Sequence, residues 1–319
     1  MKKSIIVIIV LLPLFMFGQA NKLFRKALKT EDLKERVELL DQAISINPDK
    51  LDAYFYRAIA KNDLGDYTGA IVDYSKIIIE EPDADSYFNR GNARYSLADF
   101  EGAKADYLKA TELDPYFIDA LYSLGCAHFD LGNYDEAIEV FNLVVIKEPY
   151  YAKVYTMRGL AYEHLDNFKK AIDNYTVAVL MDPSADTYYN RGVYLLGINY
   201  YKKAKSDFSQ VISRNENNSF AYFYRGACHF LLGKYKNADT DFSTALKFDS
   251  LDFDAMLGLS MMYYKQNDLA NSKAYFDKAK AILQSNGNTT SGIELFENTY
   301  WYKNQFYFFT GIFKEIDQL

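Results

Sequence analysis

Side chains that could perform acid–base, nucleophilic or metal chemistry are few in this 319-residue chain. They are three histidines, two cysteines and one glutamate beside a histidine: His128, His164, His229, Cys126, Cys228 and Glu163. No histidine has a second histidine within one helical turn, and neither cysteine completes a ligand set, so no metal-binding spacing is present. No glycine-rich phosphate loop, nucleophile elbow or zinc-protease motif occurs. We therefore expect no catalytic residue, no metal site and no cofactor, and a protein that is not an enzyme.

Glu163 and His164 are adjacent, and a histidine can titrate near neutral pH. A solvated polar surface is the simpler interpretation of this pair. An enzymatic role would require an activity that is lost when either residue is changed.

Arginine and aspartate recur sixteen residues apart, which is the second kind of chemistry in the chain. There are four such pairs: Arg57–Asp73, Arg90–Asp106, Arg191–Asp207 and Arg225–Asp241. At equivalent places Leu124 precedes Val140 and Leu259 precedes Tyr275, so charged residues go with charged and apolar with apolar. A guanidinium fits a carboxylate well, and we expect each pair to link two helices. Arg158 would pair with Asn174 or its neighbour Asp173. Scattered surface charge is the alternative.

Small residues that recur every 33 or 34 positions indicate the elements that position these pairs. One set is Ala58, Gly91, Gly125, Gly159, Gly192, Gly226 and finally Ser260. A second set follows twelve residues behind: Ala70, Ala103, Ala137, Ala171, Ala204, Ala238 and finally Ser272. Apolar residues within each half-unit recur at helical spacing, and small residues where two helices cross let their axes approach to about 8 Å. The period predicts an all-α protein of stacked helix pairs.

Further columns appear when the first small residue is counted as position 8 of each unit. Position 4 is Tyr54, Tyr87, Leu121, Tyr155, Tyr188, Tyr222 and Met256, and position 24 is Tyr74, Tyr107, Phe141, Tyr175, Phe208, Phe242 and Phe276. Proline closes the early units at Pro48, Pro82, Pro115, Pro149 and Pro183. In these columns the chain resembles the tetratricopeptide repeat (TPR) family. The resemblance implies a right-handed α-solenoid of about eight TPR helix pairs.

The same register predicts the organisation of the chain. Seven repeats form a solenoid over 51–283, starting near residues 51, 84, 118, 152, 185, 219 and 253. Residues 21–50 form a degenerate N-terminal repeat, with Arg36 where alanine is expected. A polar loop is predicted for 284–291 and a capping helix for 292–319. The aromatic residues of that last segment, including the only tryptophan, Trp301, either cover the open end of the stack or form a docking site for a partner or a membrane.

A concave groove lined by positions 2, 5 and 12 of the first helices is implied by the TPR resemblance. Its candidate partner-binding residues are Phe55, Phe88, Tyr95, Tyr122, Phe129, Tyr189, Phe223, Phe230 and Tyr264. Its acidic edge at position 2 is Asp52, Asp85, Asp119, Asp186 and Asp254. This groove suits an apolar or basic extended peptide or a helix, although ordinary repeat consensus and the helix dipole also account for these residues. Position 5 carries no lysine, so the carboxylate clamp of the family is not expected.

The first twenty residues have the order of a signal peptide. Lys2 and Lys3 precede an apolar run over 5–17, and Gly18-Gln19-Ala20 follows it. We expect export to the periplasm or cell surface, with the segment 1–20 either cleaved or kept as an anchor. Cys126 and Cys228 are three repeats apart, too far to form a disulfide. Membrane contact is expected only through an uncleaved N-terminus or the C-terminal aromatic segment.

Charge and composition narrow the partner. Acidic residues outnumber basic ones by 43 to 36, and no basic cluster is present, so nucleic acid is not an expected partner. We expect an interaction scaffold or assembly factor of the cell envelope that binds another protein, as a peptide or a helix. The alternative is a surface module that binds glycan or a small polar ligand by tyrosine stacking. The oligomeric state and the partner's identity are left open.

Overall fold

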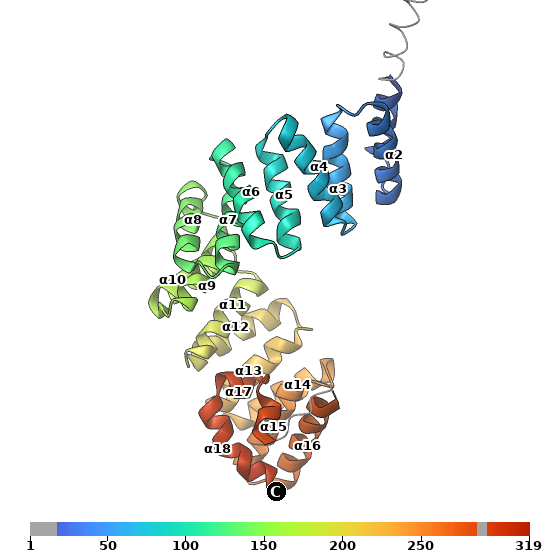
Figure 1. The fold of residues 1–319 in the computed structure, drawn as a ribbon. Coiled ribbons are helices and arrows are strands. Elements are labelled where there is room, and N and C mark those ends of the chain that lie inside the picture. The colour runs from blue at the N-terminus through green and yellow to red at the C-terminus, as the bar shows by residue number, and fades with distance from the viewer. Residues whose placement is uncertain (1–17, 286–291) are drawn as a thin grey trace, which may run out of the picture. The chain divides into compact units, whose positions relative to one another are not determined.

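The computed structural model describes residues 18–285 and 292–319, and these residues are mostly helical, with no strand among them (Figure 1). Nearly all of the predicted signal peptide at 1–20 lies outside the described residues, as do residues 286–291 of the predicted loop.

The helices follow one another along the chain with short connections. A helix over residues 18–27 comes first, and after it come α2 (Leu33–Ile46), α3 (Leu51–Asp63), α4 (Tyr67–Glu80), α5 (Ala84–Ser96), α6 (Phe100–Leu113), α7 (Ile118–Asp130), α8 (Tyr134–Lys147), α9 (Ala152–His164), α10 (Phe168–Met181), α11 (Ala185–Gly197), α12 (Tyr201–Arg214), α13 (Ser219–Leu231), α14 (Tyr235–Phe248), α15 (Phe253–Lys265), α16 (Leu269–Ser285), the 3-10 helix η1 (Gly292–Phe296), α17 (Tyr300–Asn304) and α18 (Phe306–Asp317).

The chain divides into two compact units, Met1–Asn167 and Phe168–Leu319. Helix 18–27 and α2 to α9 belong to the first unit, and α10 to α18 belong to the second. Within each unit, consecutive helices pack against one another (Figure 1). The predicted fold class, an all-α solenoid of helix pairs, is confirmed.

The first helix of each repeat begins at the residue where the sequence register places a repeat start. These residues are Leu51, Ala84, Ile118, Ala152, Ala185, Ser219 and Phe253. The reason for the register is the close contact between positions 8 and 24 of one repeat. A Cβ atom added to Gly125 would lie 2.4 Å from the ring of Phe141, and one added to Gly226 would lie 2.8 Å from Phe242. The aromatic ring of the second helix thus occupies the space that a larger side chain at position 8 would need.

In the last repeat, serine replaces glycine and alanine at the two small positions where the helices cross. Ser260 and Ser272 are fully buried. The Ser260 hydroxyl donates to the backbone carbonyl of Ser272 at 2.8 Å, so the polar atom is satisfied where the two helices cross. In the same helix, Gly258 faces the ring of Phe242 in the preceding repeat, where an added Cβ would lie 2.6 Å from the ring.

The N-terminal segment 21–50 contributes to a helix pair, residues 18–27 and α2. The first helix already covers residues 18–20, which the sequence analysis placed at the end of the signal peptide. Arg36, which stands where alanine was expected, directs its Nη2 to the carbonyl oxygen of Thr30 at 2.6 Å. The arginine therefore stabilises the connection between the two helices. It does not serve as the small residue of a close helix crossing.

The C-terminal segment 292–319 is helical, but it is not the single capping helix that was predicted, and this part of the prediction was wrong. It consists of η1, α17 and α18, and α16 continues to Ser285, two residues into the predicted loop. The Thr299 hydroxyl caps α17 by accepting the N–H of Tyr302, and Gln305 ends it with φ −132° and ψ 38°. These breaks redirect the chain, so that Phe296, Trp301 and Phe309 all enter one core.

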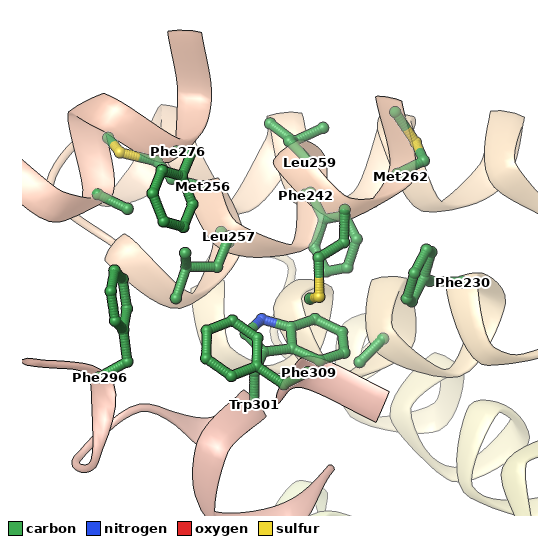
Figure 2. Packing of buried hydrophobic residues seen from close by; sticks show 14 of the residues in the cluster. Phe230, Phe242, Met256, Leu257, Leu259, Met262, Phe276, Phe296, Trp301 and Phe309 are labelled. Atoms are coloured by element: carbon green, nitrogen blue, oxygen red, sulfur yellow. The ribbon is translucent and has the colours of Figure 1, made fainter. Parts of the chain in front are cut away.

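That core is an apolar cluster built from α13 to α16 and the C-terminal segment. Trp301 and Phe309 point from the C-terminal segment toward Leu257, Phe242 and Phe230 of the repeats (Figure 2). Trp301 is completely buried. We call residues 292–319 the tail.

Candidate functional site

Each of the four predicted Arg–Asp pairs is present as a two-bond contact, in which the arginine Nε and Nη2 donate to the two carboxylate oxygens. These distances are 2.8 and 2.5 Å for Arg57–Asp73, 2.9 and 2.7 Å for Arg90–Asp106, 2.8 and 2.8 Å for Arg191–Asp207, and 2.9 and 2.7 Å for Arg225–Asp241. The aspartates are only 1–4% exposed. Each pair therefore places a neutralised charge between the two helices of a repeat.

A tyrosine at position 4 lies against each guanidinium, and this contact was missed in the sequence analysis. The distance from the guanidinium carbon to the ring centre is 5.2 Å for Tyr54, 5.5 Å for Tyr87, 5.7 Å for Tyr188 and 5.4 Å for Tyr222. A signal for it exists in the sequence. Where position 7 is Leu124 or Leu259, position 4 is Leu121 or Met256, so tyrosine and arginine are kept or lost together.

Three of these four arginines also reach the preceding repeat. Nη1 of Arg57 lies 2.6 Å from Asp41, that of Arg90 lies 3.0 Å from Ser75, and that of Arg225 lies 3.4 Å from Ser209. Nη1 of Arg158 lies 2.8 Å from Asn142 in the same way. The predicted contact of Arg158 with Asn174 or Asp173 would join the two units and stays a prediction. Arg57, Arg90 and Arg225 thus each link three helices, which is a structural role.

The aromatic residues at positions 5 and 12 of the first unit are held by ring contacts within their own repeats. Position 5 packs on position 24, with ring centres 5.8 Å apart for Phe55–Tyr74, 5.9 Å for Phe88–Tyr107 and 6.0 Å for Tyr122–Phe141. Position 12 packs on the start of the second helix, at 5.1 Å for Tyr95–Phe100 and 5.3 Å for Phe129–Tyr134. All five predicted residues, Phe55, Phe88, Tyr95, Tyr122 and Phe129, are half-buried, so each keeps solvent-accessible surface. We call them the aromatic face of the first unit.

Two aromatic residues that the sequence analysis did not include belong to this face. Phe117 lies 4.7 Å from Phe88, and Tyr151 lies 5.2 Å from Tyr122. Each immediately precedes the first helix of the next repeat, and this shared place was the available signal.

The acidic edge is open to solvent in four of its five members. Asp52, Asp85, Asp119 and Asp186 are exposed, whereas Asp254 is half-buried. The Nζ atom of Lys50 lies 3.6 Å from the Asp52 carboxylate, which is a weak surface contact. The aromatic face therefore has negative charge beside it.

In the second unit the tail covers the predicted binding residues. Phe223 and Phe230, at positions 5 and 12 of one repeat, are each 4% exposed, and the Trp301 ring lies 6.1 and 5.7 Å from their rings. The Tyr264 hydroxyl bonds to Glu315 of α18. The interpretation of Phe223, Phe230 and Tyr264 as open partner-binding residues is therefore corrected: a segment of the same chain already occupies them. Tyr189 remains half-buried beside Tyr224.

Asp254 is the polar anchor of the tail. Its carboxylate accepts the backbone N–H of Tyr300 at 2.8 Å, and its backbone carbonyl accepts Nε1 of Trp301 at 2.8 Å. Burial raises the pKa of Asp254 to about 7, against the opposing effects of the Tyr300 hydrogen bond and the Lys303 ammonium. Asp254 of the acidic edge thus binds the aromatic start of α17, which has the cation Lys303 nearby.

Burial affects both cysteines and two of the three histidines. Burial raises the pKa of Cys126 and Cys228 to about 12, which keeps both thiols protonated. Burial lowers the pKa of His128 and His229, so both favour the neutral form. His164 is exposed and stacks on Tyr134 at 4.5 Å. Among the described residues no group of three or more His, Cys, Asp or Glu could hold a metal ion.

Family models described as tetratricopeptide repeat match five segments of the chain: residues 52–84, 88–152, 152–184, 185–218 and 232–287. The chain belongs to the tetratricopeptide repeat family. TPR proteins are generally non-catalytic scaffolds that bind peptides or other proteins. None of the curated proteins matches this TPR chain.

Three solved structures illustrate what this TPR protein is similar to. A TPR protein from Parabacteroides merdae is 17% identical, with a TM-score of 0.60, over 77% of this chain and 99% of its own. The C-terminal part of a TPR protein from Cytophaga hutchinsonii is 19% identical, with a TM-score of 0.60, over 76% and 99%. A MamA protein is 27% identical, with a TM-score of 0.48, over 52% and 92%. The first two show the fold.

None of the helices in the described part of this TPR chain combines the length and apolar character that a membrane crossing requires.

Proposed function

We propose that this TPR protein is an interaction scaffold or assembly factor that binds a partner peptide or helix on the aromatic face of the first unit. The residues that carry the contact are Phe55, Phe88, Tyr95, Tyr122 and Phe129, with Asp52, Asp85 and Asp119 beside them.

One observation carries this proposal. In the second unit, positions 5 and 12 at Phe223 and Phe230 are buried because an aromatic segment lies on them. The corresponding side chains of the first unit are half-buried within the same repeat packing. Partly exposed aromatic rings held in place by a rigid scaffold lose little conformational entropy on binding, which favours their use as contact residues.

We also propose that the protein acts in the cell envelope. The support is the signal-peptide order of the first twenty residues. Cell fractionation combined with N-terminal sequencing of the mature protein tests this part. An intact Met1 in a cytoplasmic fraction would contradict it.

Site-specific photo-crosslinking in the producing cells tests the binding function. A photoreactive benzoylphenylalanine replaces Tyr95 on the aromatic face, and a control variant carries it at Ile146, whose side chain is 74% exposed on a second helix. We expect a discrete protein adduct from Tyr95 that is missing from Ile146. Identical adducts from both positions, or none from any of the five face residues, would overturn the proposal.

A further inference from the structure

The site that the tail occupies has a close counterpart in the first unit. Phe223, Phe230 and Asp254 correspond by repeat position to Phe88, Tyr95 and Asp119. Each set combines an aromatic residue at position 5, an aromatic residue at position 12, and an aspartate at position 2 of the next repeat. We call the second set the Asp119 site.

The two sets are built on the same internal packing. The position 5 ring lies 6.0 Å from the position 24 ring in Phe223–Phe242 and 5.9 Å in Phe88–Tyr107. The position 12 ring contacts the start of the second helix in Phe230–Tyr235 and in Tyr95–Phe100. The anchoring rings thus hold both sets in the same way, and the difference between them lies in what covers them.

The tail shows which chemistry this residue set binds. Tyr300 and Trp301 form the first turn of α17, where backbone N–H groups have no partner inside the helix. One of these N–H groups donates to Asp254, and the indole of Trp301 lies against both aromatic positions. Lys303, two residues after Trp301, adds a positive charge that favours the ionised form of Asp254.

The Asp119 site has part of this arrangement already filled. Phe117 contacts Phe88 at 4.7 Å, much as Tyr300 contacts Phe223 at 5.3 Å. No ring in the described part of the first unit contacts both Phe88 and Tyr95 as Trp301 contacts Phe223 and Phe230. Asp119 is exposed, and its negative charge favours a partner segment that carries a positive charge.

We infer that the Asp119 site binds a partner segment that is chemically like the tail, namely the start of a short helix that carries an aromatic side chain followed two residues later by lysine or arginine. This inference rests on the proposed function and names the class of peptide. The aromatic ring fills the place between Phe88 and Tyr95, a backbone N–H donates to the Asp119 carboxylate, and the cation lies beside it.

A synthetic peptide provides the probe. It has the sequence of residues 297–305 with the change Trp301→Phe and an N-terminal fluorophore, and its binding to the full-length chain is measured by fluorescence polarisation. Because Trp301 is the only tryptophan of the protein, its emission reports at the same time whether the chain's own tail stays in place.

Two protein variants are compared, Asp119→Lys at the site and Asp186→Lys as a matched control. Both aspartates are exposed at position 2 of their repeats, so both variants should fold. We expect saturable binding that Asp119→Lys weakens about tenfold or more and Asp186→Lys changes less than about twofold. A peptide with the further change Lys303→Glu should bind correspondingly more weakly.

Three results would overturn the inference. They are equal effects of the two protein variants, a red shift of Trp301 emission showing that the peptide displaces the tail, and no binding of the peptide at millimolar concentration. The last result, with discrete crosslinks from Tyr95, would reject the peptide class and leave the proposed function standing. Missing crosslinks would reject the function itself.

Discussion

At the scale of single residues, the arginine at position 7 shows how one side chain can align three helices. It donates two bonds to an aspartate in its own repeat, lies over a tyrosine of its own helix, and in several repeats reaches the repeat before. A buried ion pair stabilises a fold little in comparison with an apolar pair of the same shape. Its bonds are directional, however, and a repeat that is rotated or shifted would leave a buried carboxylate unpaired. We expect these residues to specify register more than stability.

The pair Arg191–Asp207 offers the clearest test. In the described part of the chain no second lysine or arginine lies within 4 Å of Asp207, so Arg191→Leu leaves a buried carboxylate without an ionic partner. We expect the free energy of unfolding to fall by roughly 3 kcal/mol in Arg191→Leu and by much less in Arg191→Leu combined with Asp207→Val. Urea denaturation followed by circular dichroism measures both.

The pairs of the first unit provide the control. Lys61 lies 2.9 Å from Asp73, and Arg94 lies 2.9 Å from Asp106, so a second cation remains after the arginine is removed. Arg57→Leu and Arg90→Leu should therefore cost less than Arg191→Leu. Equal losses in the single and double variants of the Arg191 pair would contradict this interpretation.

Asp254 predicts a pH dependence of tail docking. Its pKa of about 7 in the folded chain lies above its ordinary value of 3.8, so the folded state binds the proton more tightly than the unfolded state does. The stabilisation is complete below about pH 4 and is lost as the pH rises through 7. Each pKa unit corresponds to about 1.4 kcal/mol, and we expect the second unit to lose roughly 2–4 kcal/mol between pH 4 and 8. Denaturation monitored by Trp301 emission measures this loss.

The change Asp254→Asn should flatten that dependence. Its amide oxygen can still accept the Tyr300 N–H, and it carries no charge at any pH. The variant should be more stable than the parent at pH 8. The neighbouring Asp252, whose pKa burial also raises, leaves a smaller dependence of the same sign. An unchanged pH profile would show that Asp254 does not control docking.

At the scale of helices and turns, the connections between the two helices of a repeat repeatedly use a residue with positive φ. Gly65, Gly132 and Gly233 occupy this place in three repeats, where glycine adopts the left-handed conformation without a steric cost. In the other repeats the place holds Ala98, Asp166, Asn199 and Asn267. The repeat packing therefore imposes the turn even where the residue type does not favour it.

Ala98 is the least suited of these residues, because alanine lacks a side chain that could bond locally. With φ at 58°, its replacement in Ala98→Gly should raise the free energy of unfolding by about 0.5–1 kcal/mol. The reverse change, Gly65→Ala, should lower it by a similar amount, since a Cβ there would meet no atom within 4 Å and only the backbone is strained. Thermal unfolding of both variants measures the effect. A lower melting temperature for Ala98→Gly would contradict the argument.

Helix positions within the repeats could be predicted because each unit restates the same local signals. The small residue at position 8 and the ring at position 24 recur seven times, so errors in one repeat are corrected by the next. The tail has no such repetition. Its composition predicts a helix, but the breaks at Thr299 and Gln305 follow from docking onto Asp254, a contact 46 residues away in sequence. The tyrosine–arginine contacts could have been predicted by comparing positions 4 and 7 across the repeats.

At the scale of the whole molecule, the tail turns one end of the repeat array into a closed site. Which members of the aromatic columns are open could not be predicted from the columns themselves, because Phe88 and Phe223 occupy the same repeat position. The difference comes from a segment outside the repeats. Local sequence therefore predicted the candidate residues, and only the three-dimensional structure separates the covered ones from the open ones.

Loss of the Trp301 side chain from the tail should destabilise the second unit and leave the first unit unaffected. Trp301→Ala removes a completely buried indole, which should cost about 3–5 kcal/mol. In a repeat protein such a loss is transmitted mainly to neighbouring repeats. Hydrogen exchange measured by mass spectrometry should show lost protection in α13 and α15 and unchanged protection in α3 to α8. Uniform loss over both sets of helices would contradict this expectation, and Tyr307→Ala, at a 91% exposed residue, is the control.

The position of the tail has a consequence for how such a chain can change its length. Its contacts involve α13 to α16, and Tyr300 also packs against the cluster that contains Leu195 of α11 and Phe208 of α12, so the segment from Ala185 to Leu319 carries its own closing piece. Duplication or loss of a 34-residue repeat before Ala185 would leave that piece intact, whereas an extra repeat placed after α16 would separate the tail from Asp254. Repeats can thus be added on the N-terminal side of this module but not on its C-terminal side. The number of open aromatic sites can therefore vary while the C-terminal module stays unchanged.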